Sequence, residues 1–237
     1  MTKYIIRRLL GIIPTLFVII TISFFIVRIA PGGPFDGERA LPEVVKRNIE
    51  AKYHMNDPLL VQYGRYMFDV MRGDLGPSYR YKDHDVNFYI FQSLPNSMIL
   101  GVIAISIAVI FGITSGMLAA VKQNTWIDYL SMAIAVIGIS IPLFVIGPVL
   151  QYIFAMRLGW LPTSGWFRSG GSWKTIILPA ITLAFMDFAT IARLTRSSML
   201  ETLRSDYIRT AKAKGMKHST IIFKHAMKGA MLPIVSY

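Results

Sequence analysis

Cysteine is absent from the 237 residues of this sequence, and charged residues are scarce. Without cysteine the chain has no disulfide framework, no cysteine-ligated metal site and no thiol nucleophile. Charged residues make up 16% of the chain, whereas a soluble domain carries about 25%. This shortfall argues against an ordinary cytosolic enzyme. The hydrophobic content of 54%, together with 12% aromatic residues, excludes an intrinsically disordered chain.

Catalytic motifs are also missing. The sequence has no phosphate-binding G-x-x-x-x-G-K-[ST] loop, no H-E-x-x-H zinc motif and no G-x-S-x-G nucleophile motif. Its four histidines, His54, His84, His218 and His225, lie at no ligand spacing. We therefore expect a non-catalytic protein without a catalytic residue, a metal or a cofactor. Its energy then comes from a partner or from an ion gradient.

Long apolar runs take the place of such motifs. Leu9–Val27 holds 19 residues without a charge, and at about 1.5 Å per residue this helix approaches the hydrocarbon thickness of about 30 Å. It exceeds the apolar region of a signal peptide, about 7–15 residues, so we interpret it as a retained span. Further spans are predicted for Ser97–Val121, Tyr129–Met156 and Ile176–Ala192, and Ala230–Val235 starts a fifth. The predicted fold class is an all-α integral membrane protein with four complete transmembrane helices plus the start of a fifth.

The net charge of +12 indicates either nucleic acid or an anionic membrane surface as a partner, and the position of the charges decides between them. Lys3, Arg7 and Arg8 precede the first span, so the positive-inside rule predicts a cytoplasmic N-terminus. Counting spans from there gives the expected topology, which is outside for 31–94 and 157–175 and inside for 122–128 and 193–229.

The charges of the two large loops agree with this topology. Residues 31–94 hold eight Lys/Arg against nine Asp/Glu, a net charge of −1 that suits translocation. Residues 193–229 hold nine Lys/Arg against two acids, a net charge of +7. The sequence therefore divides into an N-terminal helix with an exported loop, 1–94, and a transmembrane domain, 95–237, with a basic cytoplasmic region at 193–229.

The exported loop contains helical patterns. Residues 42–72 predict helical pieces, interrupted at Asn56-Asp57-Pro58 and closed by the turn residues Gly73–Pro77. After the interruption, apolar and aromatic residues recur near helical spacing at Leu59, Tyr63, Tyr66 and Val70. Two interpretations stand side by side. The loop is either an outer face that receives substrate or a donor protein, or a packed cap over the helix bundle.

A stripe of small residues runs along the second span. Ala104, Ala108, Gly112, Gly116 and Ala120 recur at every fourth position, and the two glycines form G-x-x-x-G. Small residues on one face let two helix backbones approach closely in lipid. The stripe predicts helix packing, either as a fixed contact or as a joint between moving helices.

The third span is interrupted by helix-breaking residues within Gly138–Pro148. Irregular backbone at membrane depth is tolerated only against protein or a water-filled cavity. Ser140 and Pro142 are therefore candidates for lining a translocation path, with a simple kink as the alternative.

Asp187 is the one acid inside a predicted span. Burying it costs about 2.5–3.5 kcal/mol on insertion scales, so we expect it to face a cavity or a partner. It is a third candidate for the translocation path, where it would meet the amino group of a substrate. The alternative is contact with interfacial water or a neighbouring basic group near the inner end of the fourth span.

The basic region carries an amphipathic pattern. Ser198 and Glu201 have capping-box spacing and predict a helix start, and Gly215 predicts its end. A second helical segment, Ser219–Lys228, returns the chain to the membrane. Such a helix lies on anionic lipid or docks into a groove of a partner protein. Nucleic acid is disfavoured as a partner, because no recognition motif accompanies the charge. An apolar stripe on the predicted helix is formed by Leu200, Leu203, Tyr207 and Ala211.

Several motifs resemble one membrane protein family. Arg209-Thr210-Ala211-x-x-x-Gly215 is similar to the E-A-A-x-x-x-G element of permeases of ATP-binding-cassette importers, with Arg and Thr in place of Glu and Ala. The downstream residues His225–Pro233 resemble the variant found in peptide permeases. The N-terminal half resembles the oligopeptide/dipeptide (OppB/DppB) branch of that family. That second resemblance rests on Thr21–Phe25, Arg28–Pro34, Ile49–His54 and Asn56–Pro58.

The resemblance implies a type I importer permease bundle in the bacterial cytoplasmic (inner) membrane. Its implied partners are membrane lipid, a second homologous permease, two ATP-binding subunits that hydrolyse ATP, and an extracytoplasmic peptide-binding protein. The segment matching Tyr207–Gly215 inserts into a groove of the ATPase, which implies coupling roles for Tyr207, Arg209, Thr210, Ala211 and Gly215. The family continues for two further spans, so the resemblance also implies a C-terminally shortened chain.

Alternatives to an oligopeptide importer stay open at this point. Within the family, dipeptide and nickel permeases share the same frame. Outside it, a proton-coupled secondary carrier would use Asp187 as a relay. Such a carrier needs no ATPase and fails when Asp187 becomes Asn, whereas an importer tolerates that change.

Overall fold

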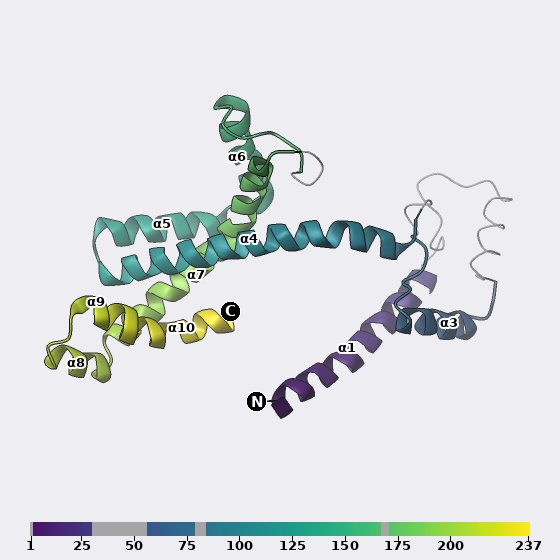
Figure 1. The fold of residues 1–237 in the computed structure, drawn as a ribbon, viewed down its shortest axis with the longest axis horizontal. Helices are drawn as coiled ribbons and strands as arrows, with labels where there is room; N and C mark the ends of the chain where they lie inside the picture. The colour runs from purple at the N-terminus through teal and green to yellow at the C-terminus, as the bar shows by residue number, and fades with distance from the viewer. Residues whose placement is uncertain (1, 30–55, 79–83, 167–170) are drawn as a thin grey trace. The chain divides into compact units, whose positions relative to one another are not determined.

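A computed structural model describes residues 2–29, 56–78, 84–166 and 171–237 (Figure 1). Regular structure in these ranges is helical, and an isolated β-bridge joins Pro77 to Asp85. Three described helices are long and apolar enough to cross a membrane, and a bent helix pair is a fourth candidate. The predicted all-α membrane fold class is confirmed. The chain forms two compact units, Met1–Leu94 and Pro95–Tyr237, which we describe separately.

In the first unit, α1 (Thr2–Ile29) contains the predicted span Leu9–Val27 and extends it at both ends. Helix α3 (Leu59–Met71) begins after Pro58, as predicted. It ends at Met71, two residues before Gly73, whose φ of +82° suits glycine, and the Asp74 N–H donates to the Asp69 carbonyl at 2.9 Å. The predicted turn at Gly73 is therefore confirmed, whereas the helical pieces predicted within 42–55 lie outside the described residues.

Aromatic side chains hold α3 against α1. The ring of Phe24, which is buried, stacks on Tyr66 at a centroid distance of 5.4 Å, and Phe25 stacks on Tyr63 at 5.4 Å. The hydroxyls of Tyr63 and Thr21 lie 2.7 Å apart. These contacts pack the described part of the predicted exported loop on the first span.

Helix α4 (Val86–Val121) begins eleven residues before the predicted start at Ser97. Pro95 lies inside this helix and does not end it. Several residues before it, among them Phe88, Ile90 and Phe91, are apolar, so hydrophobic side chains of the span continue towards the N-terminus. A lost backbone hydrogen bond at one proline is tolerated when the surrounding helix is favourable.

In the second unit, a short turn at 122–125 reverses the chain between α4 and α5 (Trp126–Ser140) (Figure 1). The predicted third span, Tyr129–Met156, is broken. Helix α6 (Leu143–Leu150) and the π-helical segment η1 (Gln151–Arg157) follow α5 at a bend of 111°. Ile141 takes extended angles, φ −94° and ψ 123°, because a residue before proline disfavours the helical region.

A single long helix runs into the first residues of the predicted cytoplasmic region 193–229. The 3₁₀ turn η3 (Trp173–Ile176) leads into α7 (Ile177–Leu203), which extends eleven residues beyond the predicted span end at Ala192. The helix start predicted from Ser198 and Glu201 is wrong, because α7 passes through both residues. Burial of Thr195 and Met199 continues the packed face of α7 through this point, so the capping-box spacing occurs inside a helix.

The C-terminal part consists of two helical runs separated by the turn at 214–217. After α8 (Asp206–Ala213), the chain forms α9 (His218–Thr220), the π-helical segment η4 (Ile221–Ala226) and α10 (Met227–Ser236). The segment predicted as Ser219–Lys228 and the predicted start of a fifth span at Ala230–Val235 therefore form one helical run. The backbone stays right-handed helical at its two junctions, Ile221 and Met227.

Candidate functional site

The short helix α8 is the clearest candidate site. Ser205 precedes it with extended angles, and its hydroxyl donates to the Thr202 carbonyl at 2.6 Å. Asp206 lies in the first turn and Lys212 in the last, where each charge is favourable to the helix dipole. A helix of eight residues is too short to be stable alone in water, so its stability comes from tertiary packing.

Gly215 ends α8 in a Schellman motif, which confirms the predicted helix end. The Met216 N–H donates to the Ala211 carbonyl at 3.3 Å, and the Gly215 N–H donates to the Lys212 carbonyl at 3.0 Å. The φ of Gly215 is +71°, in the left-handed region. The motif turns the chain sharply towards α9.

Replacement of Gly215 by alanine is expected to lower the free energy of unfolding by about 1 kcal/mol, because left-handed angles cost a residue with a Cβ roughly 1–2 kcal/mol. Space is not limiting, since no atom lies within 4 Å of a Cβ at this position. Gly215→Asn is the matched variant, because asparagine tolerates these angles, and it should retain more stability. Thermal unfolding in detergent measures both, and equal midpoints for the two variants would contradict the argument.

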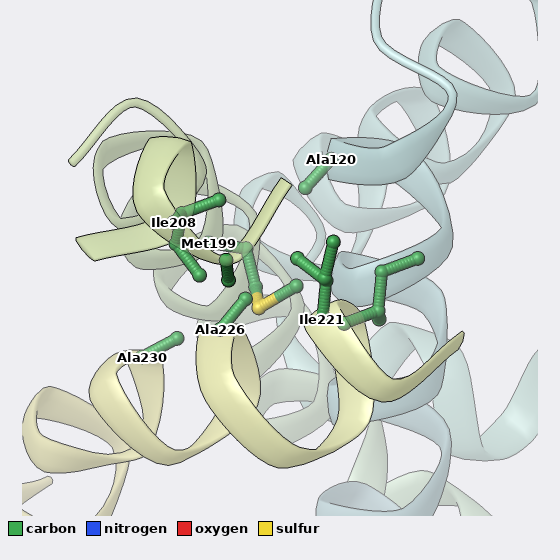
Figure 2. Packing of buried hydrophobic residues seen from close by; sticks show 8 residues of the cluster. Ala120, Met199, Ile208, Ile221, Ala226 and Ala230 are labelled. Atoms are coloured by element: carbon green, nitrogen blue, oxygen red, sulfur yellow. The ribbon is translucent and has the colours of Figure 1, made fainter. Parts of the chain in front are cut away.

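The inner face of α8 is anchored in a hydrophobic cluster. Ile208 is fully buried and Ala211 is nearly so. Figure 2 shows the Met199 side chain of α7 at the centre of this cluster, among residues of α4, α8, η4 and α10. We call this group the α8 anchor cluster. Its buried members are Ala120, Met199, Ile208, Ala211, Ile221, Ile222, Ala226 and Ala230.

The outer face of α8 is polar and basic. Arg209, Thr210, Lys212 and Lys214 are exposed. Arg209 Nη1 lies 3.4 Å from Asp206 Oδ1, an exposed pair of the kind that contributes at most about 1 kcal/mol. The guanidinium is therefore available to a partner at little cost.

The five predicted coupling residues separate into different environments. Arg209 and Thr210 lie on the outer face, and Tyr207 is about half exposed. Ala211 instead faces the α8 anchor cluster, and Gly215 forms the turn. The predicted continuous stripe from Leu200 to Ala211 is wrong, because Arg204 and Ser205 separate α7 from α8. The pattern did not single out Ile208, although it lies one helical turn before Ala211 on the same face.

Tyr207 also contacts α10. A Cβ at Gly229 would lie 2.6 Å from the Tyr207 hydroxyl and 3.2 Å from Thr202 Cγ2. The absence of a side chain at Gly229 thus makes room for the tyrosine. Tyr207 joins α8 to the helix that follows the π-helical segment.

The small-residue stripe of α4 is buried, and all five members, Ala104, Ala108, Gly112, Gly116 and Ala120, lie among the buried residues of this helix. A Cβ at Gly112 would lie 2.8 Å from Ile191 Cγ2, and one at Gly116 would lie 2.3 Å from the Ala192 carbonyl oxygen. Both contacts are made with α7. The two helix backbones approach closely where the glycines lie.

The three candidates for a translocation path lie on different elements. Ser140 and Pro142 flank the break between α5 and α6, and both are exposed. Asp187 lies in the middle of α7, because this helix is longer than the predicted span. Its Oδ1 accepts a hydrogen bond from the Tyr237 hydroxyl at 3.1 Å. The hydrogen-bond partner of this carboxylate is thus a tyrosine, and not the basic group that the sequence analysis gave as an alternative.

Sequence reasoning missed an ion pair whose carboxylate is buried. Arg196 of α7 donates to Asp128 of α5 through Nε at 2.5 Å and through Nη2 at 2.7 Å. The Asp128 side chain is 3% exposed and that of Arg196 is 26% exposed. The Asn124 N–H donates to the same carboxylate at 3.0 Å. An acid at the start of an apolar helix was the available signal, but it does not name a partner 68 positions away.

Metal-ligand clusters do not occur in the part of the chain that the structure describes, where no three histidine or acidic side chains could hold a metal ion together. The described residues of this region offer packing and docking surfaces. Among the described residues, the feature of functional interest is α8, which packs on the α8 anchor cluster and exposes a basic face.

Comparison with known proteins places these features in a family context. Residues 112–237 match the family described as "Binding-protein-dependent transport system inner membrane component", and residues 1–100 match the corresponding N-terminal family. The oligopeptide transport system permease protein OppB of Salmonella typhimurium is 53% identical over 237 residues, covering 100% of this chain and 77% of the relative.

Two further relatives show the same pattern. OppB of Escherichia coli strain K12 is 52% identical over 237 residues, covering 100% of this chain and 77% of the relative. The dipeptide transport system permease protein DppB of Bacillus subtilis is 42% identical over 236 residues, covering 100% of this chain and 75% of the relative.

Proposed function

Since the chain belongs to the family of binding-protein-dependent transport system inner membrane components, we propose that it is a permease subunit importing oligopeptides and that α8 couples it to an ATP-binding partner. The membrane permease class follows from the family, and peptide transport is supported by the relatives. Oligopeptides are favoured over dipeptides because the OppB relatives are more similar than DppB, at 53% against 42% identity. The permease is itself non-catalytic, and partner subunits hydrolyse the ATP.

The observation that carries the proposal is the two-sided character of α8. Its inner residues, Ile208 and Ala211, are held by the α8 anchor cluster, which includes side chains of α4, α7, η4 and α10. Its outer residues, Arg209 and Thr210, are exposed. A partner that binds the outer face therefore acts on several helices of the bundle through one rigid contact. Binding that favours one arrangement of such a bundle shifts its conformational equilibrium.

This geometry modifies the roles of the five predicted coupling residues. Tyr207, Arg209 and Thr210 form the surface for the ATPase groove, with Arg209 at its solvated rim, where charge tunes encounter more than affinity. Ala211 supports α8 from within, and Gly215 provides the sharp exit. The remaining partners are a second homologous permease, an extracytoplasmic peptide-binding protein and membrane lipid.

The proposed function also includes an orientation of the chain in the membrane and a set of residues that line the translocation path. The N-terminus is cytoplasmic, because Lys3, Arg7 and Arg8 precede the charge-free run Leu9–Val27 of α1, and the basic α8 then lies on the same side. The break at Ser140 and Pro142 lines the translocation path, since exposed irregular backbone at membrane depth needs a polar surrounding or protein. Asp187, on α7, lines the same translocation path.

Photocrosslinking in native membranes tests the docking surface. A benzophenone amino acid at Tyr207 is expected to capture an ATP-binding subunit, and the yield should change with nucleotide, because the partner groove closes around α8. Tyr152 of η1 is the matched control, with 47% exposure against 49% for Tyr207, and should give no such adduct. Equal capture at both positions, or no capture at Tyr207 in an inserted protein, would contradict the proposal.

A further inference from the structure

The ion pair between Asp128 and Arg196 joins three segments at one carboxylate. The bidentate contact from Arg196 ties α7 to the first turn of α5. The Asn124 N–H ties the turn between α4 and α5 to Oδ2 of the same side chain. Asn124 has a φ of +62°, so this turn is held in a left-handed conformation where its N–H reaches the carboxylate. We call this group the Asp128 clamp.

We propose that Asp128 and Arg196 are positioning residues of the transport cycle, which make α5 and α7 move as one body when the ATPase displaces α8. This inference rests on the proposed function, since it concerns how motion of α8 reaches the broken third span. The two side chains touch neither substrate nor nucleotide in this role. They set the position of α5 relative to α7.

The path from α8 to the Asp128 clamp is short and stiff. Arg196 lies seven residues before Leu203, the last residue of α7, so about two helical turns separate them. Two residues, Arg204 and Ser205, connect α7 to α8, and both donate backbone N–H groups to the last turn of α7, at 3.2 and 3.0 Å. Met199 of α7 and Ile208 of α8 also share the α8 anchor cluster. A displacement of α8 therefore moves the end of α7.

The path from the clamp to the break runs along α5. This helix contacts α7 a second time at Gly138, where a Cβ would lie 2.9 Å from the Ala189 Cβ. Ser140, two residues later, is the last residue of α5, and the 111° bend follows. Two attachment points along one helix oppose both sliding and pivoting. The end of α5 at the break thus follows α7.

The type of contact at the clamp fits this role. Apolar packing is non-directional, and small-residue contacts allow one helix to slide on another. A guanidinium and a carboxylate joined by two parallel hydrogen bonds fix orientation as well as distance. The third hydrogen bond, from Asn124, leaves the carboxylate little freedom to follow Arg196 without moving the turn. The Asp128 clamp is therefore a rigid link at the end of α5, opposite the break.

The test uses the chain with its homologous permease, ATP-binding subunits and peptide-binding protein in proteoliposomes. Peptide uptake and ATP hydrolysis are measured on the same vesicles and normalised to assembled complex. Asp128→Asn is expected to lower the peptide taken up per ATP about tenfold, as suits the loss of a hydrogen-bonded charge pair, while hydrolysis stays within about twofold. Arg196→Lys keeps the charge without the bidentate geometry and should lie between. Arg193→Gln, an exposed arginine one turn earlier on α7, is the matched control and should not change the ratio.

The outcomes separate the inference from the proposed function. A complex without ATP-driven uptake before any substitution would overturn the proposed function and the clamp with it. Normal uptake in the unmodified complex, with an unchanged ratio in Asp128→Asn, would overturn the clamp alone. A loss of uptake and hydrolysis in equal proportion would indicate a purely structural pair and also overturn it. Where Asp128→Asn assembles poorly, Arg196→Lys decides, because the clamp requires a lower ratio in that variant.

Discussion

Replacing Gly116 with alanine is expected to destabilise the second unit by about 3 kcal/mol, at the upper end of what overpacking costs. The new Cβ would lie 2.3 Å from the Ala192 carbonyl oxygen and 2.6 Å from Thr195 Cβ. The first of these atoms is backbone, so no rotamer change can relieve the contact. The helices α4 and α7 must separate, and the loss then includes contacts along the whole small-residue stripe.

Two glycines of the same helix provide the comparison. Gly101 has no atom within 4 Å of a Cβ, so Gly101→Ala should be neutral or slightly stabilising. Gly112→Ala should lie between, because its nearest atoms, Ile191 Cγ2 at 2.8 Å and Cβ at 2.9 Å, are farther away than the backbone oxygen at 2.3 Å from position 116. Thermal unfolding of the purified variants in detergent ranks them. If Gly116→Ala unfolded at the same temperature as Gly101→Ala, the close approach of α4 and α7 would be wrong.

Truncation of Ile208 to alanine is expected to detach α8 from the bundle. The side chain is fully buried, and removing a buried isoleucine costs about 2–5 kcal/mol. An isolated helix of eight residues has no stability of its own, so the whole cost falls on the seating of α8. Hydrogen–deuterium exchange over residues 204–217 should rise sharply, and nucleotide-dependent crosslinking from this region should disappear.

Thr210→Ala is the matched control on the outer face of α8. Its hydroxyl donates to the Asp206 carbonyl at 3.0 Å and faces away from the α8 anchor cluster, so exchange protection should be retained within about 0.5 kcal/mol. Its effect should instead appear in docking to the ATP-binding partner. Unchanged exchange in Ile208→Ala would show that other contacts hold α8, which would contradict the role of the α8 anchor cluster.

Local features of the chain were predictable from composition and spacing. The first span, the helix after Pro58 and the ends at Gly73 and Gly215 follow from rules that act within a few residues. A long charge-free run must satisfy its backbone internally in lipid, and that requirement needs no knowledge of the rest of the fold. Glycine at a left-handed position is likewise a local requirement.

The wrong sequence predictions concern features that tertiary packing determines. The spacing of Ser198 and Glu201 is the same inside a helix and at its start, and only the burial of Met199 and its neighbours keeps α7 continuous there. The orientation of Ala211 depends on the α8 anchor cluster, whose members come from helices up to about a hundred residues apart. The predicted apolar stripe from Leu200 to Ala211 assumed one helix, and the spacing alone could not show that α7 ends and α8 begins within it.

The chain's apolar runs, charge asymmetry and helix-ending glycines thus specify a membrane protein of α-helices, because water, lipid and backbone sterics act on each segment separately. Tertiary structure alone decides that α5 and α6 meet at 111°, that Ile208 faces inward and Arg209 outward, and that Asp128 pairs with Arg196. Each of these depends on which surfaces meet. Burial and charge pairing gain their energy from partners distant in sequence, so no pattern within one segment contains them.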